Sequence, residues 1–301
     1  YYKTFMGPKG FWKNLYEPLI RRSAGLGKPP KNFRSKSTHQ YHNTDVVIIG
    51  AGLSGLAAAK KFINTKYKVL LIEQDSYLGG VLKNSNKVKT INGLTPQEWI
   101  SETEELILNS KNITILKNTL VTTYNFTNHL IALEDKFAGK KIDLNKSELT
   151  LHKIRTSNTI IANGHIERFI SFRNNDLPGV MLASSFEKYI HRYGVVPEKE
   201  PVIFTNNASS LSLLKTLINL GCKPKAYVDS RKKDNIETEI KKILKDKEIP
   251  FFSDAEIEGC DGNKKVETIT IRQGKSFNKL KSSVLCVSGG YNPDISPRRN
   301  C

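Results

Sequence analysis

The feature that constrains this chain most is an apolar run that ends in a glycine-rich turn. Residues 46–49 read Val-Val-Ile-Ile, and Gly50, Gly52 and Gly55 follow in a G-x-G-x-x-G spacing. A β-branched apolar run of this kind is typical of a parallel strand that is buried on both faces. In such a turn the first glycine permits a sharp bend, the second lets the backbone approach a pyrophosphate, and the third allows a helix to pack closely on the strand. The stretch therefore predicts a strand, a turn and a helix that together bind a dinucleotide.

The residues that follow supply the context that this motif requires. A helix is expected over residues 54–64, and a second apolar strand over residues 68–72 ends in Glu73. Glu73 lies roughly 20 residues beyond the turn, where a carboxylate accepts hydrogen bonds from an adenosine ribose. The start of the helix directs free N–H groups and a partial positive charge at bound phosphates.

A second strand–turn–helix pattern begins at Pro201. Its strand leads into the turn Thr205–Ser210, a helix is expected over residues 209–220, and the next strand ends in Asp229. This layout repeats that of the first unit, but no glycine occupies the turn. Because close approach of a pyrophosphate needs those glycines, we expect the second nucleotide site to be degenerate.

The alternation of these units indicates an α/β fold with two Rossmann-like three-layer units, the second inserted in the first. We expect an irregular N-terminal segment over residues 1–44, with a short helix over residues 11–22 that is interrupted at Pro18. The segment is expected to lie across the folded body or against a partner, and we favour packing on the body because Phe11, Trp12 and Tyr16 would otherwise be exposed. The first domain is expected to comprise residues 45–195 and 281–301. The inserted domain is expected over residues 196–280, after which the strand before Gly289 and Gly290 returns to the first domain.

Other segments indicate a helix, a connector and several strands. Thr95 and Glu98 form a capping box before a helix that is expected to extend to Leu108. We expect a polar connector over residues 167–181. Buried or antiparallel strands are expected over residues 113–116, 121–124, 130–133, 148–151 and 159–161.

Composition narrows the class of protein further. The net charge of +18 favours either a solvated lysine-rich surface or an anionic partner, and we prefer the first because no nucleic-acid-binding motif accompanies the charge. No apolar run is long enough to span a membrane, and residues 1–5 lack the apolar core of a signal peptide. The cysteines are far apart, which argues against a metal site and a redox-active dithiol and suggests reduced thiols in the cytoplasm. They are Cys222, Cys260, Cys286 and Cys301.

Four segments together resemble the α subunit of heterotetrameric sarcosine oxidase, within the pyridine nucleotide-disulfide oxidoreductase superfamily. They cover residues 15–27, 164–169, 174–184 and 287–293, and they span nearly the whole chain. The sequence departs from the family pattern in two places. Ala162-Asn163-Gly164 stands for the usual Ala-Thr-Gly, and Glu167-Arg168-Phe169 stands for Glu-Arg-Pro.

The resemblance implies that the chain is the middle of a longer subunit, between a ferredoxin-like region and a folate-binding region similar to aminomethyltransferases. It implies NAD at the first dinucleotide site, with FAD as the alternative there. It also implies a β subunit that carries FAD and oxidises sarcosine to glycine, FMN at the interface between the two subunits, and other small subunits.

Carried over by position, the resemblance also implies a set of cofactor-binding residues around the first turn. These are Gly50, Ala51, Gly52, Leu53, Ser54, Gly55, Glu73, Gln74, Gly80, Val121, Ala162, Gly164, Gly289 and Gly290. No serine, cysteine or carboxylate lies at a spacing from the histidines that is typical of a catalytic site. We therefore expect no catalytic residue in this chain. Two alternatives remain: an independent FAD-dependent NAD(P)H oxidoreductase, and a scaffold whose nucleotide never turns over.

Overall fold

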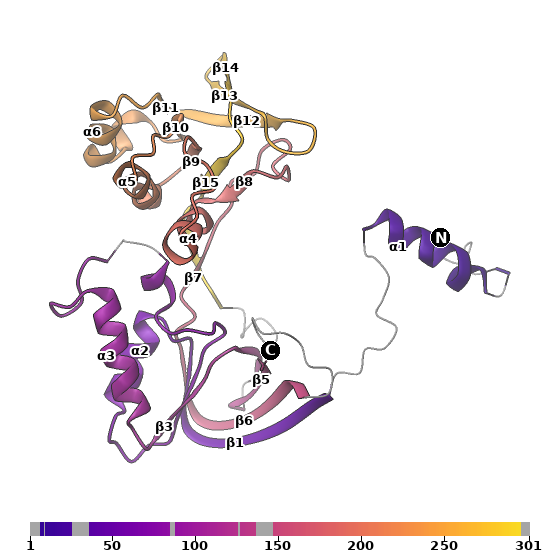
Figure 1. Ribbon diagram of the computed structural model, residues 1–301, viewed down its shortest axis with the longest axis vertical. Helices are drawn as coiled ribbons and strands as arrows, with labels where there is room; N and C mark the ends of the chain where they lie inside the picture. The colour runs from indigo at the N-terminus through magenta and orange to yellow at the C-terminus, as the bar shows by residue number, and fades with distance from the viewer. Residues whose placement is uncertain are drawn as a thin grey trace.

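The structure is a computed structural model. It describes residues 7–8, 10–25, 36–84, 88–125, 127–136 and 147–295. Two sheets, one mixed and one parallel, each have helices on one face, and a narrow two-stranded ribbon joins them (Figure 1). The expected α/β class with two Rossmann-like units is confirmed.

The first sheet has six strands in the order β3-β2-β1-β6-β5-β4. The four strands β3, β2, β1 and β6 are parallel, and β5 and β4 are antiparallel additions at one edge. The strands are β1 (Lys36–Ile49), β2 (Val69–Ile72), β3 (Ile113–Leu116), β4 (Thr119–Asn125), β5 (His129–Asp135) and β6 (Ser147–Ile161).

The end of β1 is buried on both faces, as its apolar run predicts. Val46 and Ile48 pack with α2 (Leu53–Lys61) and α3 (Pro96–Leu108), whereas Val47 and Ile49 pack toward β4 and β5. Thr95 and Glu98 form the expected capping box at the start of α3. Local patterns of apolar residues and helix caps were therefore sufficient to predict this part of the fold.

The long strands β1 and β6 differ from expectation. They pair in parallel from Lys36 to Ile49 and curve together below the helices (Figure 1). Residues 36–44 are therefore not irregular, and the two strands expected within residues 148–161 are one strand. The alternation along β6 was hidden because its inward-facing positions include the polar Thr150 and His152.

The N-terminal segment contains the expected short helix but differs in its packing. Residues 12–23 form a π-helical turn (Trp12–Tyr16) and α1 (Glu17–Ser23), with Pro18 in the first turn of α1. A proline is tolerated there because it removes an N–H group that has no partner within the helix. None of these residues is buried, and α1 stands apart from both sheets (Figure 1), so the expected packing across the body is wrong for the described part of the chain.

The second sheet is parallel throughout, in the order β11-β10-β9-β15-β8. Its strands are β8 (Val180–Leu182), β9 (Val202–Thr205), β10 (Ala226–Asp229), β11 (Phe251–Ser253) and β15 (Leu285–Ser288). One face packs against the helices α4 (Ala183–Tyr193), α5 (Leu211–Asn219) and α6 (Thr238–Asp246). The other face packs against the antiparallel strands β12 (Ala255–Asp261), β13 (Thr268–Gln273) and β14 (Ser276–Lys281).

The placement of β8 and β15 corrects the expected return to the first domain. β15 lies between β9 and β8, so the strand before Gly289 belongs to the second sheet. A buried apolar run identifies a central strand but does not identify its neighbours. On sheet membership, we propose that the second unit extends from residue 180 to residue 288.

The chain leaves and re-enters the first unit through the ribbon. Strands β7 (His165–Glu167) and β16 (Tyr291–Pro293) pair antiparallel, and the N–H of Asp294 donates to the carbonyl of Gly164. None of the described helices is both long and apolar enough to cross a membrane.

Candidate nucleotide-binding site

Three neighbouring strands of the first sheet end side by side at the candidate site. β2 ends before Glu73, β1 before Gly50, and β6 before Ala162. The sheet order β2-β1-β6 therefore sets out Glu73, the glycine turn and Gly164 in a row along one edge. Ligands of open α/β sheets bind at such carboxyl ends.

The glycines of the turn are required by backbone geometry. Gly50 has φ +95°, and a Cβ atom there would lie 2.5 Å from the carbonyl oxygen of Ala162. A Cβ atom at Gly55 would lie 1.8 Å from the carbonyl oxygen of Gly50, so this glycine lets α2 pack against the turn. These two glycines perform the first and third roles that the motif predicts.

Gly52 is positioned for the second role, the close approach of backbone to a pyrophosphate. A Cβ atom built there meets nothing within 4 Å, so the backbone is open on that side. Gly52 is also the N-cap of α2, and no side chain accepts a hydrogen bond at this cap. Exposed N–H groups at a helix start beside an open glycine form an anion-binding site.

The loop after β2 closes against this turn. Gly80 has φ +51°, and a Cβ atom there would lie 3.1 Å from the Cα atom of Gly52. The N–H of Gly79 donates a 2.8 Å hydrogen bond to the carbonyl of Ala51. The two glycines after β2 therefore bring a second backbone segment to the edge of the site.

Glu73 is buried beside the turn, with 6% of its surface exposed. Its Oε2 accepts the N–H of Ala51 at 2.7 Å, and its Oε1 accepts the N–H of Asp75 at 2.9 Å. Burial raises the pKa of this carboxyl, and the backbone hydrogen bonds oppose that shift. The carboxylate therefore holds the turn in shape and also lines the site.

A cleft of about 660 Å³ runs along this edge, which is within the range of small-molecule sites. Ten of the expected residues line it: Gly50, Gly52, Leu53, Ser54, Glu73, Gln74, Gly80, Val121, Ala162 and Gly164. Val121 reaches the cleft because the first sheet curls, and the N–H of Thr119 at the start of β4 donates to the carbonyl of Glu73. Ala51 is fully buried and supports the turn through its hydrogen bond to Glu73.

Gly289 and Gly290 are placed differently from the other expected residues. The N–H of Gly289 donates to the carbonyl of Arg168, and a Cβ atom at Gly289 would lie 2.6 Å from that oxygen. Neither glycine is among the residues that line the cleft. They allow the close pairing that leads into the ribbon, and Tyr291 is the neighbour that reaches the cleft.

The far end of the cleft contains residues that sequence reasoning missed. They come from the ribbon and the first turns of α4: Glu167, Ser184, Ser185, Glu187, Lys188 and Tyr291. The sequence does contain a signal for the helix α4. Phe186 and Ile190 have the spacing of one helix face, and Gly194 follows as a left-handed C-cap. The strand before α4 has only three residues, which made it difficult to identify.

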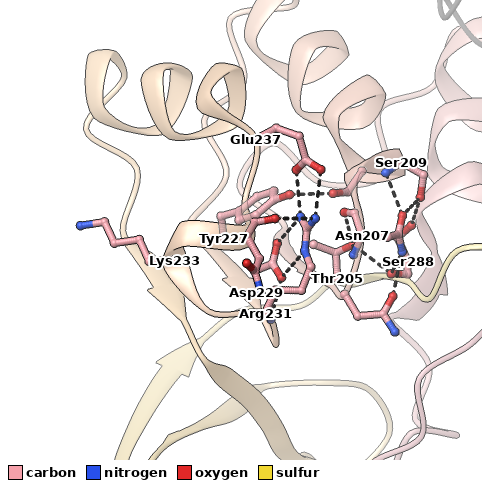
Figure 2. Close-up of polar contacts among 12 residues, drawn as sticks. Thr205, Asn207, Ser209, Tyr227, Asp229, Arg231, Lys233, Glu237 and Ser288 are labelled. Atoms are coloured by element: carbon pink, nitrogen blue, oxygen red, sulfur yellow. Dashed lines mark hydrogen bonds and ion pairs between the residues drawn. The ribbon is translucent and has the colours of Figure 1, made fainter.

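The second turn is held together by its own side chains (Figure 2). Thr205 and Asn207 each donate a 3.0 Å hydrogen bond to the carbonyl of Ser288. The Asn207 side chain also accepts hydrogen bonds from the backbone and hydroxyl of Ser209. Side chains thus occupy the space where glycines would admit a pyrophosphate.

The carboxylate that follows the second turn is also engaged (Figure 2). Asp229 is fully buried, and both of its oxygens accept hydrogen bonds from Arg231, at 3.1 and 2.9 Å. Arg231 also donates two 3.0 Å hydrogen bonds to Glu237, and these partners raise the pKa of its guanidinium. The geometry agrees with the expectation that this second site is degenerate.

Reactive groups are sparse in the described part of the chain. His165 lines the cleft and packs against Tyr291 in a tilted arrangement, with 4.2 Å between the ring centroids. Cys286 is fully buried in β15, where burial and the nearby Glu167 and Glu187 raise its thiol pKa far above the ordinary range. The described residues include no group of three or more candidate metal ligands.

Comparison with known proteins agrees with this geometry. Residues 44–300 match the family described as pyridine nucleotide-disulphide oxidoreductase. The sarcosine oxidase subunit alpha of Rhizobium meliloti (strain 1021) is 32% identical over 98% of this chain. The same subunit of Corynebacterium sp. (strain U-96) is 27% identical over 90% of the chain. The chain spans 29% of the length of each of these curated relatives.

Solved structures share the fold. Thioredoxin reductase from T. acidophilum has a TM-score of 0.63 and 15% identity, with 85% of this chain and 79% of that chain covered. L-proline dehydrogenase from P. horikoshii has a TM-score of 0.57 and 20% identity, with 91% and 47% covered. The family match covers both units and the cleft between them, and the chain therefore belongs to the pyridine nucleotide-disulphide oxidoreductase family.

Proposed function

We propose that this chain is the dinucleotide-binding part of the α subunit of a sarcosine oxidase-type flavoenzyme complex, with NAD bound at the first glycine turn. The observation that carries the proposal is the open backbone at Gly52. It lies at the uncapped start of α2, in a cleft that Glu73 also lines. The similarity to sarcosine oxidase alpha subunits supports the assignment to that complex.

The residues of the cleft fit a dinucleotide. Glu73 offers a carboxylate for an adenosine ribose, the turn offers backbone N–H groups for a pyrophosphate, and Gly164 leaves room beyond the end of β6. NAD is preferred over FAD on the resemblance to the sarcosine oxidase α subunit alone. In this proposal FAD and the amine-oxidising site belong to a β subunit, FMN lies between the subunits, and sarcosine is the substrate.

A stand-alone FAD-dependent NAD(P)H oxidoreductase is the second candidate. The fold shared with thioredoxin reductase from T. acidophilum is compatible with it, and in this reading FAD would bind at the first Rossmann-like unit and NAD(P)H at the second. The second turn argues against it, because Asn207 fills that turn and Arg231 neutralises Asp229. A scaffold with a structural nucleotide is compatible with the first proposal.

The nucleotide content of the purified protein tests the proposal. We expect the chain alone to carry NAD, identified by mass after denaturation, and to show no flavin absorbance. Purified together with a β partner, it is expected to gain flavin absorbance that sarcosine bleaches. A yellow chain on its own, bleached by NADPH, would overturn the proposal in favour of the reductase.

A further inference from the structure

One carboxylate at the far end of the cleft has a role that folding alone does not explain. Glu167 ends strand β7 and is buried, with 7% of its surface exposed. Its Oε2 accepts a 2.7 Å hydrogen bond from the N–H of Ser184, in the first turn of α4. Leu182, the N-cap of α4, provides no side-chain acceptor, so Glu167 supplies one from the ribbon.

The second oxygen of this carboxylate is unexplained. Oε1 of Glu167 is buried and has no hydrogen-bond partner among the described residues. A buried polar atom without a partner is costly, and that cost is greater when the group is charged. Capping α4 needs only one oxygen, so an uncharged residue with a single acceptor would serve the helix equally well.

The position of Glu167 indicates what the second oxygen binds. The edge of the first sheet presents Glu73, then the glycine turn, then Gly164. The ribbon begins at His165, directly after Gly164, and carries Glu167 into the lining of the same cleft. A dinucleotide with its adenosine ribose at Glu73 and its pyrophosphate at the turn would extend its other half past Gly164, toward Glu167.

We propose that Glu167 is a ligand-binding residue for the non-adenosine half of the dinucleotide. Its Oε1 accepts a hydrogen bond from an N–H or O–H donor there, either the carboxamide of a nicotinamide or a hydroxyl of the second ribose. The same side chain, through Oε2, fixes the start of α4 and so couples the second unit to the ligand. This inference rests on the proposed function, because it requires a dinucleotide in the cleft.

Three ligands test the inference by isothermal titration calorimetry on the chain after its bound nucleotide has been removed: NAD, ADP-ribose and ADP. ADP reaches only the adenosine half and the pyrophosphate, ADP-ribose adds the second ribose, and NAD adds the nicotinamide. The variant Glu167→Gln keeps an acceptor for the N–H of Ser184 but replaces the second oxygen with a donor. We expect it to weaken NAD binding by about tenfold or more and to leave ADP binding unchanged.

ADP-ribose locates the donor on the ligand. A loss shared by NAD and ADP-ribose assigns the donor to the second ribose, and a loss for NAD alone assigns it to the carboxamide. Both results support the inference. Glu167→Asp keeps the charge but has a shorter side chain. It is also expected to weaken NAD binding and to leave ADP binding unchanged.

Glu98→Gln is the matched control, because Glu98 also accepts an N–H group at a helix start but does not line the cleft. It is expected to leave the binding of all three ligands unchanged. Equal losses of NAD and ADP in Glu167→Gln, or no loss of either, would overturn the inference and leave Glu167 as a helix cap. Failure of the unsubstituted chain to bind NAD and ADP would instead overturn the proposed function, and the inference with it.

Discussion

The backbone N–H of Ala51 donates a 2.7 Å hydrogen bond to Oε2 of Glu73 and so ties the glycine turn after β1 to the end of β2. Both oxygens of Glu73 accept backbone N–H groups, because Oε1 is bound by Asp75. The residue that the motif assigns to a ribose is therefore also part of the scaffold of the turn. This dual use makes the stability of the first unit depend on the protonation of one carboxyl.

Glu73→Gln is expected to change how stability depends on pH. Burial raises the pKa of Glu73, so the folded state binds this proton more tightly than the unfolded state does. The unsubstituted chain therefore loses stability as pH rises from the ordinary range of a glutamate through the raised pKa, and the variant lacks that loss. Urea unfolding between about pH 4 and pH 7.5 measures the difference. Parallel curves for the two proteins would contradict the prediction.

Arg231→Ala is expected to destabilise the second unit by about 3 kcal/mol, because it leaves the buried Asp229 carboxylate without its partner. Adding Asp229→Asn should recover most of that loss. The control is Arg272→Ala, which removes exposed ion pairs and is expected to cost less than about 1 kcal/mol. Equal losses of stability for the two arginine substitutions in chemical denaturation would show that the buried Asp229 carboxylate does not depend on its ion pair with Arg231.

His42 is expected to make the long strands sensitive to acid. Its Nε2 lies 2.9 Å from Nδ1 of His152, and His152 in turn contacts Glu134 at 3.2 Å. Burial, and then the neighbouring His152, lower the pKa of His42. Stability is therefore lost as pH falls below about 6.5, where the unfolded chain takes up the proton more readily.

The variant His42→Gln should lose less stability than the unsubstituted chain between about pH 7 and pH 5. Tyr41→Phe, an exposed neighbour on the same strand, should keep the original slope. The measured quantity is the midpoint of urea unfolding at each pH. A His42→Gln slope as steep as the original would assign the acid sensitivity to other groups.

Much of the first unit was predictable because its signals are local. The buried run before Gly50, the spacing of Gly52 and Gly55, and the capping box at Thr95 each depend on residues close together in the sequence. The curled sheet was not predictable, since half of β1 is polar and its partner β6 lies about a hundred residues later. The pairing of such strands depends on contacts distant in sequence, which periodicity does not report.

The candidate site divides in the same way. The half around the turn and Glu73 followed from the motif, and the structure brings those residues together. The half around Glu167 and α4 did not, because Ser184 and Lys188 reach the cleft only through the short ribbon that joins the units. Gly289 was expected at the cleft from resemblance, and in the structure its N–H group donates to the carbonyl of Arg168.

Titration of NAD into the nucleotide-free chain and into its nucleotide-free Gly52→Val variant tests whether the dinucleotide binds at the glycine turn. A Cβ atom at Gly52 meets no protein atom within 4 Å, so we expect the variant to fold with an unchanged melting temperature. Gly55→Ala should destabilise the fold, since its Cβ atom would lie 1.8 Å from the carbonyl oxygen of Gly50. We expect Gly52→Val to lose at least about tenfold in NAD affinity while remaining folded. Full NAD affinity in that variant would contradict binding at the glycine turn.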